Sequence, residues 1–177
     1  LWGASCHPVC SPTPDAIGAN FPGVIRQLIR DDFGRSDLPV LFLQGFSGDV
    51  RPASFTTRPA RGLRSMAVYL ANHGRVFAPQ STAAFAGWCA GVHAAVRSAL
   101  NEAEIGDLPL DAISSRQVSD HPEGWGRPVT LTQIGLGANV HLVAVNAEVM
   151  SGRVGSLSSL GPHVIPVGCA DEVIGYW

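Results

Sequence analysis

The sequence Val40-Leu41-Phe42-Leu43-Gln44-Gly45-Phe46-Ser47-Gly48-Asp49-Val50-Arg51-Pro52 sets an apolar run directly before a glycine-rich polar turn. A buried strand that feeds such a turn is typical of the edge of an α/β sheet, where loops carry functional groups. We therefore expect a strand over residues 40–43. Functional side chains are expected in the turn, where the candidates are Ser47, Asp49 and Arg51.

Two other stretches of the chain have a similar form. Ala4-Ser5-Cys6-His7-Pro8-Val9 sets a histidine where a strand would end, and Glu148 follows the strand-like run 143–147. Ends of strands are a common place for ligands that come from distant parts of a chain. Sequence spacing alone does not pair His7 with Glu148, so on the residues alone each is a weak candidate metal ligand.

The rest of the pattern predicts helices and strands in alternation. Apolar periodicity predicts helices and alternating or apolar runs predict strands, whereas proline, glycine and polar clusters predict connections. Helices are expected over 24–29, 66–70, 81–104 and 150–160, a hairpin over 129–134 and 140–145, a strand over 164–168, and connections over 53–64 and 107–128. This order indicates an α/β (mixed α+β) chain with mixed sheets and flanking helices.

Composition limits the classes of function. A chain of 177 residues fits a single domain, and 46% hydrophobic against 15% charged residues indicates a globular protein. Net charge is −2 and no Lys/Arg run occurs, which argues against nucleic acid as a partner. The apolar runs are too short for a transmembrane segment. Both ends are apolar, so we expect residues 1–177 to be the central part of a longer catalytic domain.

Several segments, taken together and in order, resemble the neutral/alkaline non-lysosomal ceramidases and their bacterial relatives. These segments cover nearly the whole chain: Ser5-Cys6-His7-Pro8-Val9, Gly18-Ala19-Asn20-Phe21-Pro22-Gly23, Leu43-Gln44-Gly45, Gly48-Asp49-Val50-Arg51-Pro52, Asn146-Ala147-Glu148-Val149 and Ala170-Asp171-Glu172 with Gly175-Tyr176. The resemblance implies a zinc amidohydrolase that cleaves the amide of an N-acyl lipid such as ceramide by metal-activated water. His7, Glu148 and Tyr176 match the family's zinc ligands, and a further zinc histidine and an active-site tyrosine would lie outside this sequence.

An imidazole, a carboxylate and a phenol oxygen suit Zn²⁺ as the cofactor. The implied partner is a small-molecule or lipid substrate, with access to substrate at a membrane surface, and the family resemblance points to a secreted or periplasmic enzyme. Because its first shell lacks the further histidine, the 177-residue chain by itself is expected to bind zinc weakly and to be inactive. The sequence does not give the oligomeric state.

One position departs from the family. Ceramidases carry a serine, proposed to take part in catalysis, just before the proline of the glycine-rich turn, and Arg51 stands there in this chain. Arginine cannot serve as nucleophile or base, but it can bind an anion or stabilise an oxyanion. We therefore take Arg51 and Asp49 as the candidate catalytic residues, with ion pairing and turn formation as their structural alternatives.

Two other functions stay open. Gly45-Phe46-Ser47-Gly48 resembles the nucleophile elbow of a serine esterase, although Asp49 stands where the elbow needs glycine. Loss of activity in Ser47→Ala but not in His7→Ala would favour that function. A non-catalytic relative would bind no metal.

Overall fold

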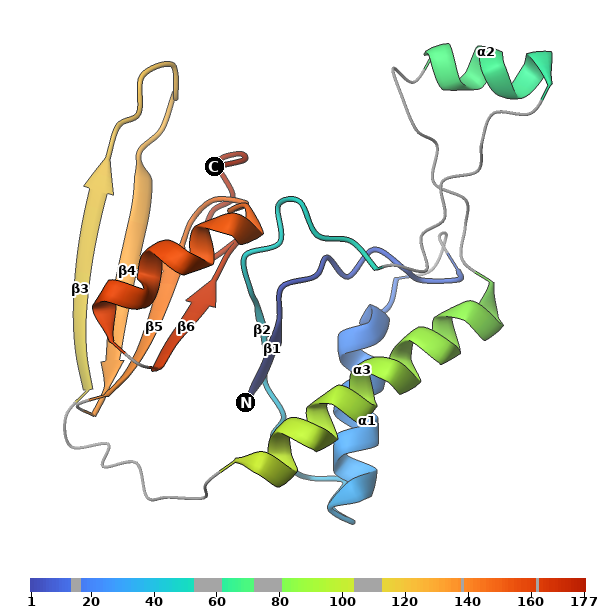
Figure 1. Cartoon of the computed structure of the whole chain (residues 1–177), viewed down its shortest axis with the longest axis horizontal. Helices are drawn as coiled ribbons and strands as arrows, with labels where there is room; N and C mark the ends of the chain where they lie inside the picture. The colour runs from blue at the N-terminus through green and yellow to red at the C-terminus, as the bar shows by residue number, and fades with distance from the viewer. Residues whose placement is uncertain (14–16, 53–61, 72–80, 104–112, 138, 162) are drawn as a thin grey trace. The chain divides into compact units, whose positions relative to one another are not determined.

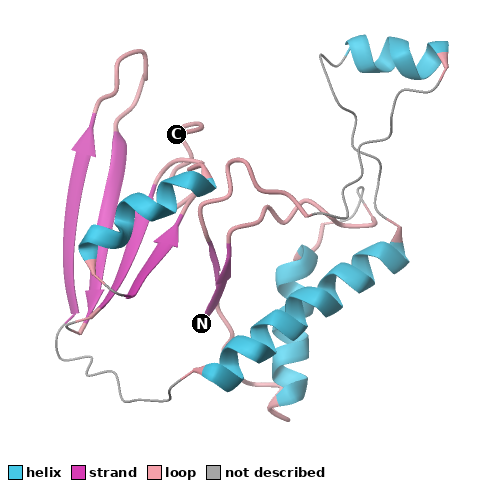
Figure 2. Ribbon diagram, in the orientation of Figure 1, coloured by secondary structure: helices cyan, strands magenta, loops and turns pink. Residues whose placement is uncertain are grey.

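The computed structural model describes residues 1–13, 17–52, 62–71, 81–103, 113–137, 139–161 and 163–177. The chain forms two compact units. The sheet unit comprises Leu1–His7, Leu41–Val50 and Glu102–Trp177, and the helical unit comprises Pro8–Val40 and Arg51–Asn101. Strands and helices are both present, so the predicted α/β class is confirmed (Figures 1 and 2). That the chain is one domain stays a prediction.

The sheet unit contains a short pair of parallel strands. β1 (Trp2–Ala4) lies beside β2 (Phe42–Gln44), with Trp2 opposite Phe42 and Ala4 opposite Gln44. The rings of Trp2 and Phe42 lie 4.7 Å apart and add aromatic packing to this pairing. The strand expected over residues 40–43 is therefore confirmed, displaced by one to two residues.

The larger sheet has four strands in the order β3-β4-β5-β6. β4 (Val129–Leu136) and β5 (Val140–Val145) form the predicted hairpin, and β6 (His163–Val167) runs parallel to β5. Gly137 takes a positive φ of 66° in the hairpin turn, a conformation that glycine adopts without strain. The helix expected over 150–160 is a 3₁₀ helix, η2 (Ser151–Leu160).

The core of the sheet unit explains why the Glu148 side chain points away from that core. Val145, Ala147 and Val149 alternate along the chain and are buried together with Phe46 and Val129. Because successive side chains of an extended segment point to opposite sides, the residue between Ala147 and Val149 points away from this core. Glu148 therefore lies on the other side of the segment.

The connection expected over 107–128 is wrong in part. It contains β3 (Ile113–Asp120), which pairs antiparallel with β4 along its whole length. All eight residues of β3 are exposed, so no apolar alternation marks the strand in the sequence. Backbone pairing holds it instead. Residues 104–112 lie outside the described part of the chain.

The helical unit contains α1 (Asn20–Asp32), α2 (Leu63–Ala71) and α3 (Thr82–Glu102). All three helices were expected, but α1 begins earlier and ends later than residues 24–29. Its buried side is formed by Phe21, Ile25 and Ile29. The Ser81 hydroxyl accepts the Ala84 N–H at 3.2 Å and caps the N-terminus of α3.

A pair of ionisable side chains joins α1 to α3. His93 Nε2 lies 2.7 Å from Asp32 Oδ2, so this histidine is tied to a carboxylate within the helical unit. Across the described residues no helix is long and apolar enough to cross a bilayer. The loop expected over 53–64 lies mostly outside the described residues.

Candidate metal centre

The predicted site residues follow the carboxyl ends of parallel strands. His7 lies three residues beyond β1, the turn 45–50 follows β2, and Glu148 lies three residues beyond β5. The Gly168 N–H, just after β6, donates to the Gln44 carbonyl at 2.9 Å and joins the ends of β6 and β2. In α/β sheets this edge is where ligands bind.

Backbone hydrogen bonds lock these segments together. The His7 N–H donates to the Val50 carbonyl at 3.3 Å, and the Gly48 N–H donates to the Val149 carbonyl at 2.8 Å. The turn 45–50 therefore lies between the segments that carry His7 and Glu148. A Cβ at position 48 would come within 2.9 Å of the Glu148 carbonyl oxygen, so this close approach needs glycine.

The structure brings the side chains of His7 and Glu148 together. His7 Nε2 contacts Glu148 Oε1, and the two side chains are only 16% and 15% exposed. The imidazole and the carboxylate therefore form an ion pair or hydrogen bond that is largely shielded from water. These two predicted ligands, distant in sequence, are therefore neighbours.

Tyr176 is placed by the backbone next to Glu148. The Glu148 N–H donates to the Gly175 carbonyl at 2.8 Å, and the Trp177 N–H donates to the Glu148 carbonyl at 3.0 Å. These bonds make Glu148 and Tyr176 a parallel bridge pair. Directly paired residues have their side chains on the same side, so Tyr176 shares a side with Glu148. The Tyr176 side chain is 54% exposed.

The donor types fit a zinc ion. Nitrogen of histidine and oxygen of a carboxylate are common zinc ligands, and Tyr176 offers a third donor on the same side as Glu148. Among the described residues no group of three or more His, Cys, Asp or Glu side chains gathers in one place, so the third donor would have to be of another type.

Two cysteines near these segments, Cys6 and Cys169, have thiols whose pKa is raised by their surroundings. Burial raises the pKa of the Cys6 thiol to about 11, and burial followed by the negative charge of Glu148 raises the pKa of Cys169. A raised pKa is the effect that burial away from water has on a thiol.

Asp49 serves the backbone of η2. One carboxylate oxygen accepts the Ser151 N–H at 2.7 Å and the other accepts the Ser151 hydroxyl at 3.2 Å. These hydrogen bonds lower the pKa of Asp49. The carboxylate thus fixes the first residue of η2 to the turn 45–50, which is a structural role. Arg51 is exposed and is assigned to the helical unit, so catalytic roles for both residues stay predictions.

Ser47 has the surroundings of a structural residue. Its side chain is 1% exposed, and its hydroxyl accepts a hydrogen bond from Gln44 Nε2 at 2.7 Å. Gln44 Nε2 also donates to the Cys6 carbonyl at 3.1 Å, so this amide ties the end of β1 to the turn after β2. The role of Gln44 was missed from the sequence. The sequence feature that could have indicated this role of Gln44 is its position as a polar residue between an apolar strand and Gly45.

Two cavities of the sheet unit lie beside these segments. One, of about 410 Å³, is lined by Trp125, Arg127, Gly175 and Tyr176 among others. The other, of about 330 Å³, is mainly apolar and runs from Leu1–Ser5 to Val164–Pro166. The first includes a predicted metal ligand in its wall. The second touches Ser5, two residues before His7.

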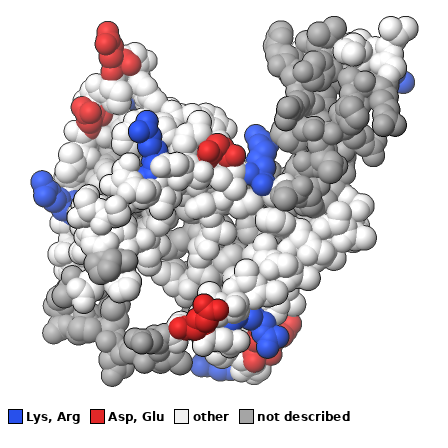
Figure 3. All heavy atoms as spheres, viewed as in Figure 1, with Lys and Arg blue, Asp and Glu red and all other residues white. Residues whose placement is uncertain are grey.

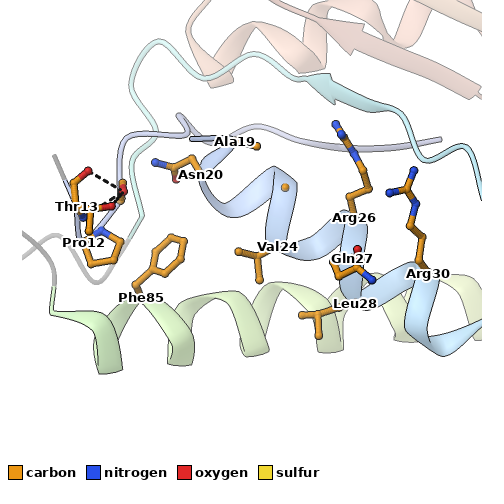
Figure 4. Close-up of a pocket in the computed structure, with 12 residues that line it drawn as sticks. Pro12, Thr13, Ala19, Asn20, Val24, Arg26, Gln27, Leu28, Arg30 and Phe85 are labelled. Carbon is orange, nitrogen blue, oxygen red and sulfur yellow. Dashed lines mark hydrogen bonds between the residues drawn. The ribbon is translucent and has the colours of Figure 1, made fainter. Parts of the chain in front are cut away.

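A third cavity, of about 730 Å³, belongs to the helical unit. Val24 and Leu28 of α1 point toward α3, which carries Phe85, whereas Arg26 and Arg30 leave α1 on another side (Figure 4). Arg30 is held by the Leu38 carbonyl, which accepts its Nε–H at 2.9 Å. None of the predicted site residues is among the described residues that line this cavity.

Comparison of the chain with models of protein families, with curated proteins and with solved structures gives no match.

Proposed function

We propose that this chain carries part of the active site of a zinc-dependent amide hydrolase acting on an N-acyl lipid or a related small molecule. One observation supports this most strongly: His7 Nε2 contacts Glu148 Oε1 at the carboxyl ends of parallel strands. The ordered resemblance to neutral ceramidases provides the reaction class. The zinc ligands in this proposal are His7, Glu148 and Tyr176.

The chain's own residues hold and orient the donors. Backbone hydrogen bonds at the N–H groups of His7 and Glu148 fix both segments, so their side chains are directed before any ligand arrives. His7, Glu148 and Tyr176 would hold the zinc ion, which when bound would supply a Lewis acid for the substrate carbonyl and for a water molecule. Arg51 would supply a positive charge for the oxygen that becomes negative during amide cleavage.

The two cavities of the sheet unit fit the two ends of such a substrate. The apolar cavity along Leu1–Ser5 suits a hydrocarbon chain, because burial of apolar surface favours binding. The cavity beside Tyr176, with Arg127 and Trp125 in its wall, suits the polar end. A substrate of this kind is amphiphilic, which agrees with the expected access to substrate at a membrane surface.

The test is an equilibrium zinc titration of the longest natural protein that contains these residues, with the wild type compared against His7→Ala and Glu148→Ala. We expect about one zinc per wild-type chain and a large loss of affinity in both variants, because each removes one ligand. His93→Ala is the matched control: it also breaks a histidine–carboxylate pair, with Asp32 in the helical unit, and should leave zinc binding unchanged.

Zinc absent from the wild-type form of that longer protein, or retained in both variants, would contradict the proposal. Activity toward N-acyl substrates is best measured on the longest natural protein that contains these residues. There, activity lost in Ser47→Ala and kept in His7→Ala would support the serine esterase instead. The burial of Ser47 gives that alternative no support.

A further inference from the structure

β3 forms one edge of the larger sheet, and no other described strand pairs with its outer side (Figure 1). The strand has eight residues and contains neither proline nor glycine. Such an edge presents a row of backbone N–H and C=O groups that can pair with another strand. All eight side chains are exposed, so the outer side is accessible.

An apolar row of the sheet ends at this edge. Val145 of β5 lies opposite Leu131 of β4, and Leu131 lies opposite Val118 of β3. Val145 is fully buried, Leu131 packs partly buried against the core, and Val118 is 50% exposed. The row therefore runs from the core to solvent, where a further apolar side chain beside Val118 would extend it.

Opposite charges stand on either side of Val118. Arg116 and Asp120 lie two residues before and after it, so all three side chains share one face of the sheet. Neither charged residue forms an ion pair with another described residue, and both are exposed. An antiparallel strand carrying the opposite order of charges would complement this edge.

A second copy of β3 is such a strand. We propose that two copies of the chain associate by antiparallel pairing of their β3 edges, with Val118 opposite Val118. In this register each Arg116 faces Asp120 of the other copy, and the apolar row continues across the interface. The two four-stranded sheets would then join into one.

Other registers lack this complementarity. Antiparallel pairing puts directly opposite side chains on the same face, which restricts the register to steps that keep the faces matched. Centring the pair on Gln117 places each Arg116 opposite Val118 and leaves both charges unmatched. Centring it on Arg116 places two arginines opposite each other. The proposal does not depend on the metal site.

The experiment measures the mass of the chain by sedimentation across a concentration series. The wild-type chain should approach twice the mass of one chain as its concentration rises. Arg116→Glu and Asp120→Arg should each weaken self-association by about tenfold or more, because each places like charges opposite one another twice in the symmetric pair. Far-UV circular dichroism should show both variants folded like wild type.

Mixing the two charge-reversal variants tests the proposed register directly. At this edge Arg116→Glu carries two acidic side chains and Asp120→Arg two basic ones. An equimolar mixture should therefore form a heterodimer at a concentration at which each variant alone is mostly monomeric. The double variant should dimerise like wild type. Arg153→Glu, an exposed charge reversal in η2, should leave association unchanged.

Three results would overturn the proposal. They are a wild-type chain that stays monomeric throughout the series, single variants that dimerise like wild type, and a variant mixture that stays monomeric. A wild-type chain that stays monomeric would mean that the edge of β3 does not pair with a second copy of itself.

Discussion

At the scale of single residues, the thiol of Cys6 gives a test of the packing around the candidate centre. Burial raises its pKa from the ordinary 9.0 to about 11, and alkylation requires the thiolate. We expect the alkylation rate of Cys6 in the folded chain to rise with a midpoint near pH 11, whereas in the unfolded chain it should follow an ordinary thiol. Iodoacetamide labelling followed by mass spectrometry at each pH measures this.

The same shift predicts how stability depends on pH. A pKa raised in the folded state means that the folded chain keeps a proton which the unfolded chain releases. The contribution of Cys6 to the free energy of unfolding is therefore complete below pH 9 and is lost as the pH rises toward 11. Cys6→Ser should show a shallower loss of stability over this window. A Cys6 midpoint near pH 9 in the folded chain would show that the thiol is not buried.

The site residues differ in how far the sequence could predict them. His7 and Glu148 were placed at strand ends from apolar runs, and the structure does bring their side chains together. Their pairing could not be deduced from spacing, since it depends on the turn 45–50 bonding to both segments. The ordered resemblance supplied it. The sequence around Ser47 did not separate a glycine turn from a nucleophile elbow, because both place a serine between closely spaced glycines.

At the scale of elements, adding a methyl group at a glycine should destabilise the chain in the turn 45–50 and stabilise it in α3. Gly48→Ala should lower the free energy of unfolding by about 1–3 kcal/mol, because a Cβ would come within 2.9 Å of a backbone oxygen that cannot move away alone. It should also weaken zinc binding, since that oxygen belongs to Glu148. Urea unfolding and zinc titration measure the two effects.

Gly91→Ala is the matched control within α3. A Cβ there would meet no atom within 4 Å, and alanine favours a helix over glycine by about 0.5–1 kcal/mol. This variant should therefore be more stable than wild type, with unchanged zinc binding. Equal effects from both substitutions would contradict the close contact at Gly48.

Elements were predictable where one side is buried. α3, β4 and β5 carry apolar residues at the spacing of a helix or in strand-like runs, and all three lie close to where the sequence indicated. β3 was missed because its eight exposed residues show no such pattern. Its register comes from β4, through pairs such as Val118 with Leu131, which is a long-range cause that local pattern does not contain.

At the scale of the whole molecule, charge is sparse and mixed. Figure 3 shows the Arg, Asp and Glu side chains of the described residues scattered over the face it draws, without a gathering of one sign. The net charge of −2 agrees with this distribution. The face drawn there carries no single-sign field of the kind that steers a highly charged polymer. A small-molecule or lipid substrate, rather than nucleic acid, stays a prediction.

The division into two units leads to a prediction about where a metal acts. His7, Glu148 and Tyr176 all belong to the sheet unit, and α1 and α3 belong to the helical unit. A ligand that binds only the folded state stabilises whatever unfolds together with its site, by about 2.7 kcal/mol at 100 times its dissociation constant. We expect added zinc to slow amide hydrogen exchange around residues 4–9, 45–50, 146–150 and 174–177, and to leave α1 and α3 unchanged.

Hydrogen-exchange mass spectrometry with and without zinc resolves these segments, and His7→Ala is the control in which zinc should change none of them. Protection that rises equally in α1 and α3 would show that the chain unfolds as one cooperative domain, as its length predicts, rather than as two. Protection that rises only outside the four segments would place the metal elsewhere. Because the backbone bonds of Glu148 and Gly48 join three of these segments directly, their exchange should slow together, as one unit.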